Sequence, residues 1–213
     1  MRWLVSIMFG LLKGVTMRKI SFLFSVLVLG LACVANAATD WIIDLDPGVI
    51  YFNSSANDFD LQRGVEEESL SIFSSFPRIS TGVSVEQPEG YFDARVGVGM
   101  LLNNSLSTTA VFGQLAYSYE IKPSIMIGPH IGYSMYSAPE WWGDAEVEFD
   151  STSGYMLGGH LTMGDKIAYI FSVDMVNAEY DVKSTSGGWS VANGQTTLDL
   201  SGLMISFGFL ARF

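Results

Sequence analysis

The sequence predicts an all-β protein, an eight-stranded antiparallel up-and-down barrel whose strands cross a membrane. Three observations predict this fold. From Trp41 onward apolar residues recur at every second position, which is the period of a strand with two different faces. Short turns alternate with longer polar connections, as they do in membrane barrels. Within the strands the charged residues share a face with the glycines, so the bulky apolar face is free to meet lipid.

The first 37 residues have the organisation of a secretory leader. A basic Met17-Arg18-Lys19 precedes an apolar run over residues 20–34 and the small-residue triplet Ala35-Asn36-Ala37. This order is typical of a signal peptide, so we predict a signal over 1–37 and an outer-membrane β-barrel over 38–213. A signal does not need the apolar segment before Met17, and we therefore expect translation to start at Met17.

The single cysteine, Cys33, lies inside this leader. The predicted mature chain therefore has no thiol, which excludes disulfides and cysteine-bound zinc. Residues 29–33 loosely resemble a lipoprotein signal, so lipidation at Cys33 is the alternative to cleavage after Ala37.

The charge balance narrows the choice of partners. The chain has 11 basic and 22 acidic residues, and four of the basic ones lie in the leader. The predicted mature chain keeps seven basic residues against 22 acidic ones, a net charge of −15. A charge of this sign argues against nucleic acid and against electrostatic docking on anionic lipid, and it suits a surface that meets cations.

Eight segments with the two-residue period follow one another along the chain. We predict strands over residues 41–52, 71–86, 91–102, 108–121, 124–137, 153–164, 167–183 and 198–213. Tight turns lie at 87–90, 122–123 and 165–166, and the other four connections are longer and polar. We therefore expect short periplasmic turns on one rim and long extracellular loops on the other. An even number of strands closes without an exposed edge.

The two faces are clearest in three strands. The strand over 91–102 alternates apolar residues with charges and glycines, with Phe92, Ala94, Val96, Val98 and Met100 against Asp93, Arg95, Gly97 and Gly99. The strand over 124–137 repeats the pattern with isoleucines on one side and His130 between glycines on the other. The last strand has a lipid-facing row that comprises Leu203, Ile205, Phe207, Phe209, Ala211 and Phe213. A soluble sandwich alternates as well, but its outward face is polar.

The opposite faces place a set of polar and charged residues in the lumen: Asp44, Asp46, Arg78, Glu86, Asp93, Arg95, Gln114, Glu120, His130, His160, Asp174 and Arg212. Charges in an interior of low dielectric constant are stable only when they are paired. We interpret the set as a polar plug that fills the barrel and fixes its register, with a gated or narrow pore as the alternative. We expect Arg212 to reach Asp44 or Asp46 on the first strand.

The two histidines are predicted to face each other. The loop between the fifth and sixth strands centres near residue 145, midway between His130 and His160. Two hydrogen-bonded interior histidines are the simpler interpretation, and a weak metal site or a pH-sensitive element is the alternative. Two ligands without a third make a poor zinc site, so we assign no metal here.

The long loops hold candidate interaction residues. Asp144, Glu146, Glu148 and Asp150 alternate with apolar residues, so an extended hairpin gathers four carboxylates on one face. Such a row is a candidate calcium site, although a solvated acidic strand is the simpler interpretation and we predict no obligatory cofactor. Trp141, Trp142 and Trp189 are predicted to face outside, where tryptophans mark a partner, lipopolysaccharide or lateral packing. Tyrosines near strand ends, among them Tyr91 and Tyr180, suit interfacial girdles.

Two stretches carry a family resemblance. The terminal Gly208-Phe209-Leu210-Ala211-Arg212-Phe213 resembles the aromatic assembly signal that the barrel-assembly machinery reads at Phe213, and residues 122–133 resemble a recurring turn and strand. The chain thereby resembles the small eight-stranded outer-membrane barrels that include OmpA-like and OmpX/Ail-like proteins. The resemblance implies a monomer in the outer membrane of a Gram-negative bacterium, in contact with lipid and lipopolysaccharide.

The resemblance also implies a non-enzymatic role as an envelope-structural protein or as a surface adhesin and colonisation factor, with a host or cell-surface ligand. A narrow, porin-like solute channel is the alternative. A lipid A-modifying enzyme is less expected, because His130 and Ser134 are too far apart along a strand for proton transfer and no long loop contains a histidine. A periplasmic β-sandwich lipoprotein is the third possibility.

Overall fold

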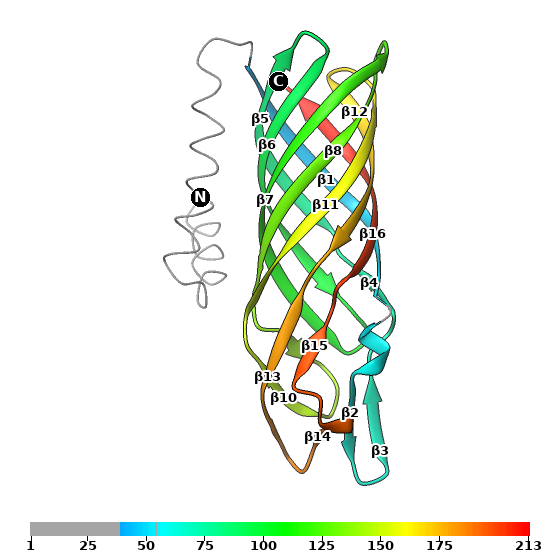
Figure 1. Ribbon diagram of the computed structural model, residues 1–213, viewed down its shortest axis with the longest axis vertical. Coiled ribbons are helices and arrows are strands. Elements are labelled where there is room, and N and C mark those ends of the chain that lie inside the picture. The colour runs from blue at the N-terminus through cyan, green and yellow to red at the C-terminus, as the bar shows by residue number, and fades with distance from the viewer. Residues whose placement is uncertain (1–38, 54) are drawn as a thin grey trace.

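The computed structural model describes residues 39–53 and 55–213, and the predicted signal peptide lies outside them. Eight long strands pair antiparallel in a closed ring, β1–β5–β6–β7–β8–β11–β12–β16, which returns to β1 (Figure 1). Their bounds are Thr39–Phe52, Arg78–Gln87, Gly90–Leu102, Leu106–Lys122, Ile125–Tyr136, Thr152–Met163, Ile167–Val176 and Gly202–Arg212. The predicted eight-stranded barrel is therefore confirmed.

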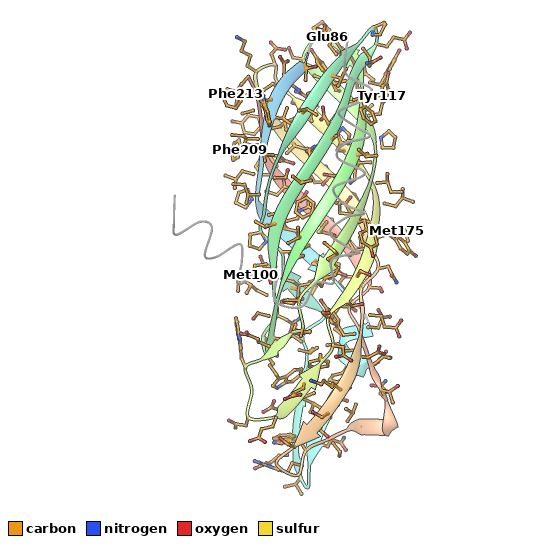
Figure 2. All side chains as sticks on the ribbon, turned by 90° about the vertical axis from the view of Figure 1, so that its left-hand side faces the viewer. Glu86, Met100, Tyr117, Met175, Phe209 and Phe213 are labelled. Atoms are coloured by element: carbon orange, nitrogen blue, oxygen red, sulfur yellow. The ribbon has the colours of Figure 1, made fainter. Side chains whose placement is uncertain are left out.

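The outer wall of the barrel is apolar. Burial in β12 alternates without interruption, so that Ile167, Tyr169, Phe171, Val173 and Met175 are exposed and the residues between them are buried. Figure 2 shows side chains projecting from the wall along the whole barrel. This surface has the composition of the lipid-facing band of a membrane barrel. No helix in the described residues has the length and apolarity that a membrane crossing requires.

The two ends of the barrel differ. At one end, which we call the short-turn rim, β5 and β6, β7 and β8, and β11 and β12 are joined by tight connections, and β1 begins beside the end of β16. Ser124 and Gly164 take positive φ angles of 64° and 128° in two of these turns. At the opposite end, β6 and β7 are joined by residues 103–105 alone, so only three of the four connections predicted to be long are long, and these extend the molecule well beyond the barrel, as Figure 1 shows.

The long connections form a folded cap rather than separate loops. One small sheet joins β2 (Asp60–Arg63), β3 (Glu66–Ser69) and β14 (Ser190–Val191). A second joins β10 (Glu146–Phe149), β13 (Glu179–Ser186) and β15 (Thr197–Asp199). The cap also contains 3₁₀ turns at Ser55–Asp58 and Ala192–Gly194, and β4 (Phe73–Ser75) and β9 (Glu140–Trp141) pair with barrel strands.

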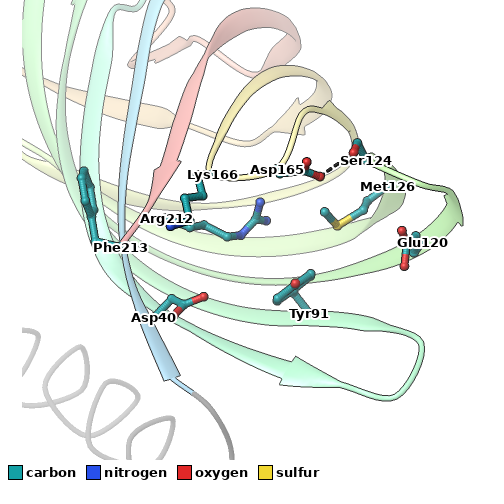
Figure 3. Close-up of a pocket in the computed structure, with 9 residues that line it drawn as sticks. All are labelled: Asp40, Tyr91, Glu120, Ser124, Met126, Asp165, Lys166, Arg212 and Phe213. Atoms are coloured by element: carbon teal, nitrogen blue, oxygen red, sulfur yellow. Dashed lines mark hydrogen bonds between the residues drawn. The ribbon is translucent and has the colours of Figure 1, made fainter.

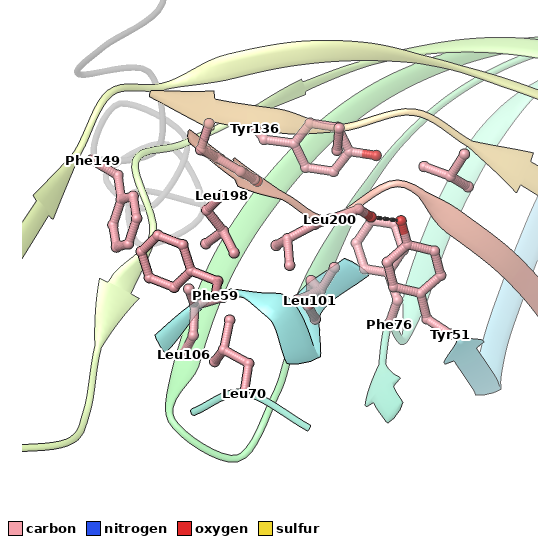
Figure 4. Close-up of a cluster of buried hydrophobic side chains, with 14 of the residues drawn as sticks. Tyr51, Phe59, Leu70, Phe76, Leu101, Leu106, Tyr136, Phe149, Leu198 and Leu200 are labelled. Atoms are coloured by element: carbon pink, nitrogen blue, oxygen red, sulfur yellow. Dashed lines mark hydrogen bonds between the residues drawn. The ribbon is translucent and has the colours of Figure 1, made fainter. Parts of the chain in front are cut away.

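An apolar core holds the cap together and closes the adjoining barrel mouth. Phe59, Leu70, Leu198 and Leu200 are each at most 2% exposed and belong to one cluster with Tyr51 (Figure 4). The Tyr51 hydroxyl donates a hydrogen bond to the backbone carbonyl of Leu200, which ties the cap to the barrel wall. The cluster therefore gives the cap a preferred shape of its own.

Three strands predicted as continuous are interrupted where the barrel gives way to the cap. The segment 71–86 divides into β4 and β5 at Pro77, which lacks the N–H that a sheet ladder needs. The segment 167–183 divides into β12 and β13, and the segment 198–213 into β15 and β16. The strands on either side of each interruption keep the two-residue period. Periodicity alone therefore does not reveal the interruptions.

Candidate functional site

The lumen contains ten of the predicted polar residues, and every barrel strand contributes at least one. All ten are buried: Asp44, Asp46, Arg78, Asp93, Arg95, Gln114, His130, His160, Asp174 and Arg212. The other two expectations were wrong, because Glu86 and Glu120 lie at the short-turn rim and are exposed. A strand that runs past the rim carries its inward-facing residues into water.

The first part of the lumen network is centred on Arg95. Its Nη1 donates to Asp44 Oδ2 at 2.5 Å, and its Nη2 lies 3.4 Å from Asp93 Oδ2. Ser84 donates its hydroxyl to Asp93 Oδ1 at 2.6 Å. The side chains of Arg95, Asp44 and Asp93 are nearly inaccessible to water, so each charge is compensated mainly by the others. The arrangement joins β1, β5 and β6.

The second part begins at Arg78 and continues through hydroxyls. Arg78 Nη2 donates to Asp46 Oδ2 at 2.7 Å and to Ser206 Oγ at 3.3 Å. Ser206 is hydrogen bonded to Ser172, whose hydroxyl donates to Asp174 Oδ2 at 3.3 Å. The candidate lumen set omitted these serines, although their even spacing from Asp174 and Arg212 places them on the inward face.

The structure brings the two histidines together. Their Nδ1 atoms are 3.2 Å apart, His130 Nε2 bonds Asp174 Oδ1, and His160 Nε2 lies 2.8 Å from Ser118 Oγ. The result is a buried relay of Ser118, His160, His130 and Asp174 across four strands. Gly158 makes room for it, because a Cβ there would collide with Asp174 Oδ1 and lie 2.8 Å from His130 Nε2.

This relay includes a serine, histidines and a carboxylate, but its geometry does not support catalysis. Ser118 and Asp174 are fully buried, so a substrate has no route to the hydroxyl. No group of three or more histidine, cysteine, aspartate or glutamate side chains in the described residues is arranged to hold a metal ion. The arrangement instead satisfies polar groups that would otherwise be buried without partners.

Arg212 does not reach Asp44 or Asp46, and that expectation was wrong. The barrel register sets Arg212 opposite Ile42, two residues from the predicted position. Its side chain extends across the lumen, where its guanidinium lies 4.8 Å from the centre of the Tyr91 ring and 4.0 Å from Asp93 Oδ2. The two aspartates are paired with Arg95 and Arg78 instead.

The acidic row of the cap is exposed but is not a simple hairpin. Glu146 and Glu148 lie on β10, which pairs with β13 from the following long connection. Glu148 is 3.4 Å from Lys183 Nζ, and Ser186 donates a hydrogen bond to Glu146. The register shift after Glu148 places its extra residue, Lys183, on β13, and exposure along 144–150 keeps its two-residue period, so Asp144, Glu146, Glu148 and Asp150 are all exposed while Ala145 and Phe149 are buried.

The three tryptophans have different environments. Trp189 is only 5% exposed, and Arg63 stacks over its ring at 4.8 Å, so the prediction that it faces outside was wrong. Trp141 is half-buried and packs against Phe59 and Phe149, whereas Trp142 is 56% exposed. The first two strengthen the cap because their rings bury large apolar areas. Tyr180, predicted for a girdle, also lies in this core.

Glu68 is a cap residue that sequence reasoning missed. Its carboxylate accepts hydrogen bonds from Trp141 Nε1 at 2.6 Å and from the backbone N–H of Asp144 at 2.7 Å. It therefore fastens the connection between β8 and β11 to the β2–β3 hairpin. It stands in a run of three glutamates, and nothing in such a run distinguishes the one that forms contacts.

Solved structures include membrane barrels of similar architecture. The outer membrane protein OprG from Pseudomonas aeruginosa is 11% identical, with a TM-score of 0.49 over 83% of this chain and 97% of that chain. Neisserial surface protein A is 10% identical, with a TM-score of 0.45 over 83% and 99%. The outer membrane protein AlkL, determined in lipid bilayers, is 11% identical, with a TM-score of 0.45 over 83% and 91%. Neither a protein-family model nor a curated protein matches the chain.

Proposed function

We propose that the protein is an outer-membrane barrel with a closed lumen, which presents a preformed acidic surface outside the cell and adheres through it to cationic partners. The folded cap carries this proposal. Its core of buried apolar side chains fixes the backbone of three long connections that belong to different parts of the chain. A surface that is ordered before binding loses less entropy when a partner docks.

Acidic residues dominate the cap. Residues 53–72, 137–151 and 177–201 include only two basic side chains, Arg63 and Lys183, which are already paired with Glu66 and Glu148. The acidic residues of the same segments are Asp58, Asp60, Glu66, Glu67, Glu68, Glu140, Asp144, Glu146, Glu148, Asp150, Glu179, Asp181 and Asp199. Such an excess attracts lysine- or arginine-rich surfaces over a distance that salt shortens.

The packed lumen favours a presenting role over a narrow channel. An eight-stranded barrel has room only for its own side chains, and here ion pairs and hydrogen bonds link them across the axis. We expect no steady conductance when the purified protein is reconstituted into planar bilayers. Conductance steps that depend on protein concentration would favour the channel instead.

Cells that display the protein test the adhesive role. We expect them to retain more fluorescent oligolysine peptide than cells without it, with the difference disappearing as salt rises. The double variant Glu67→Gln/Glu140→Gln removes two exposed cap charges and lowers that difference. The matched variant Glu86→Gln/Glu89→Gln removes two exposed charges from the short-turn rim and leaves it unchanged. Equal retention by both variants would reject the cap as the binding surface.

A further inference from the structure

A cavity opens at the short-turn rim, at the other end of the molecule from the acidic cap. It has a volume of about 340 Å³, within the range of small-molecule sites. Its lining comes from β1, β6, β7, β8, β16 and the β11–β12 turn, and comprises Asp40, Tyr91, Glu120, Ser124, Met126, Asp165, Lys166, Arg212 and Phe213 (Figure 3). The strands of the barrel thus bring together residues that are distant in the sequence.

Arg212 is the central feature of this cavity. Its side chain is 5% exposed, and Figure 3 shows the guanidinium pointing into the space between the turns. Nε, Nη1 and Nη2 form no hydrogen bond with any other described residue, and Asp93 is at the 4.0 Å limit of an ion pair. Arg78 and Arg95, by contrast, each donate to a carboxylate at 2.7 Å or less. A buried cation with unused donors is costly unless another group accepts from it.

We propose that this cavity binds a small organic monocarboxylate, with the carboxylate on Arg212. The planar guanidinium presents parallel N–H donors that match both oxygens of a carboxylate. The Tyr91 ring lies against the guanidinium at 4.8 Å and restricts its orientation before binding. Lys166 supplies a second positive charge on the rim, and Met126 gives the cavity apolar surface for the body of the ligand.

The remaining lining residues limit the charge of the ligand. Asp40, Glu120 and Asp165 surround the positive centre with carboxylates, and Asp165 also accepts a hydrogen bond from Ser124. A single negative charge can pair with Arg212 and lie away from these groups. A dianion carries a second charge that the acidic rim repels, so propionate is expected to bind more tightly than hydrogen phosphate.

Nuclear magnetic resonance of the refolded full barrel tests the site, with the Arg212 Nε–Hε signal assigned by its loss in Arg212→Gln. Titration with propionate should shift this signal saturably, and hydrogen phosphate should shift it only at higher concentrations. A change of this signal that never saturates, or an equal response to both anions, would overturn the proposal. The test does not depend on the cap, so it is independent of the adhesive role.

Two rim variants extend the test without altering Arg212. Lys166→Gln should weaken propionate binding by roughly threefold, because it removes an exposed attractive charge. Glu120→Gln should strengthen it, since it removes a repulsive one. Lys122→Gln is the matched control, because Lys122 is an exposed lysine at the end of β7 that does not line the cavity. If Lys166→Gln and Lys122→Gln have the same effect, the anion does not occupy this cavity.

Discussion

The middle of the lumen and the cap are stabilised by opposite chemistry. The lumen is held by polar and charged groups and the cap by apolar ones, although the strands of both alternate between apolar and polar residues. In the lumen, Arg78 pairs with Asp46 of the neighbouring strand and Arg95 pairs with Asp44 two strands away, and hydroxyls and histidines fill the remaining space. In the cap, Phe59, Leu198 and their neighbours exclude water and the charges lie outside. The barrel wall already has an apolar surface outside, so its interior is where polar groups must be satisfied. The cap meets water outside and therefore has an apolar interior.

The largest effect is expected from breaking a lumen pair. Arg95→Met leaves Asp44 and Asp93 buried with their main partner removed, which should lower the free energy of unfolding by about 3–5 kcal/mol. This loss of stability is measured by urea unfolding of the barrel in lipid vesicles, with the folded fraction read from its migration on a gel run without boiling. Lys183→Met removes an exposed cap pair and should cost less than about 1 kcal/mol. Equal losses would show that burial does not distinguish the two pairs.

A cavity created by substitution in the apolar core of the cap should unfold the cap but leave the barrel folded. Leu198 is fully buried, so Leu198→Ala should cost about 2–5 kcal/mol of local stability and speed amide exchange in β10, β13 and β15. Barrel strands should keep their protection. The lipid-facing Leu203→Ala, 40% exposed on β16, serves as the control and should leave exchange in the cap unchanged. Faster exchange throughout the barrel would mean that the two regions form one cooperative unit.

Adjacent glycines provide a sharper test of the lumen packing. Gly158→Ala forces a methyl group against Asp174 and His130, and we expect a loss of about 1–3 kcal/mol in the same urea experiment. Gly159→Ala places its methyl group on the other face, where the nearest atom is the Gly128 carbonyl oxygen at 3.6 Å. This control should change stability little. A loss at Gly159 as large as that at Gly158 would contradict the tight packing of the relay.

The smallest effect is expected at the exposed tryptophan. Trp142→Ala should change the free energy of unfolding in urea by less than about 0.5 kcal/mol, because Trp142 is already 56% exposed. Trp189→Ala should cost several times more because it removes a buried ring and the partner of Arg63. Similar losses for the two variants would show that their different burial has no energetic consequence.

More of the barrel than of the cap could be predicted from the sequence. Period-two alternation placed Arg95, His130 and Asp174 on the inward face because strand geometry alone fixes side-chain direction. Alternation does not fix register to the residue, so Arg212 was assigned to the wrong partner. The cap depends on contacts between distant segments, such as Glu68 with Trp141, and no local pattern reports them. For the same reason Trp189 was predicted to be exposed although it is buried.

A double-mutant cycle on Arg78 and Asp46 tests most directly whether paired charges stabilise the lumen. Their side chains are 2.7 Å apart and almost completely buried. Arg78→Gln and Asp46→Asn should each lower the free energy of unfolding of the barrel in urea. The loss in the double variant should be smaller than the sum of the two single losses, and the difference should exceed about 1 kcal/mol. Additive losses within about 0.5 kcal/mol would contradict the pairing, since independent sites behave in that way.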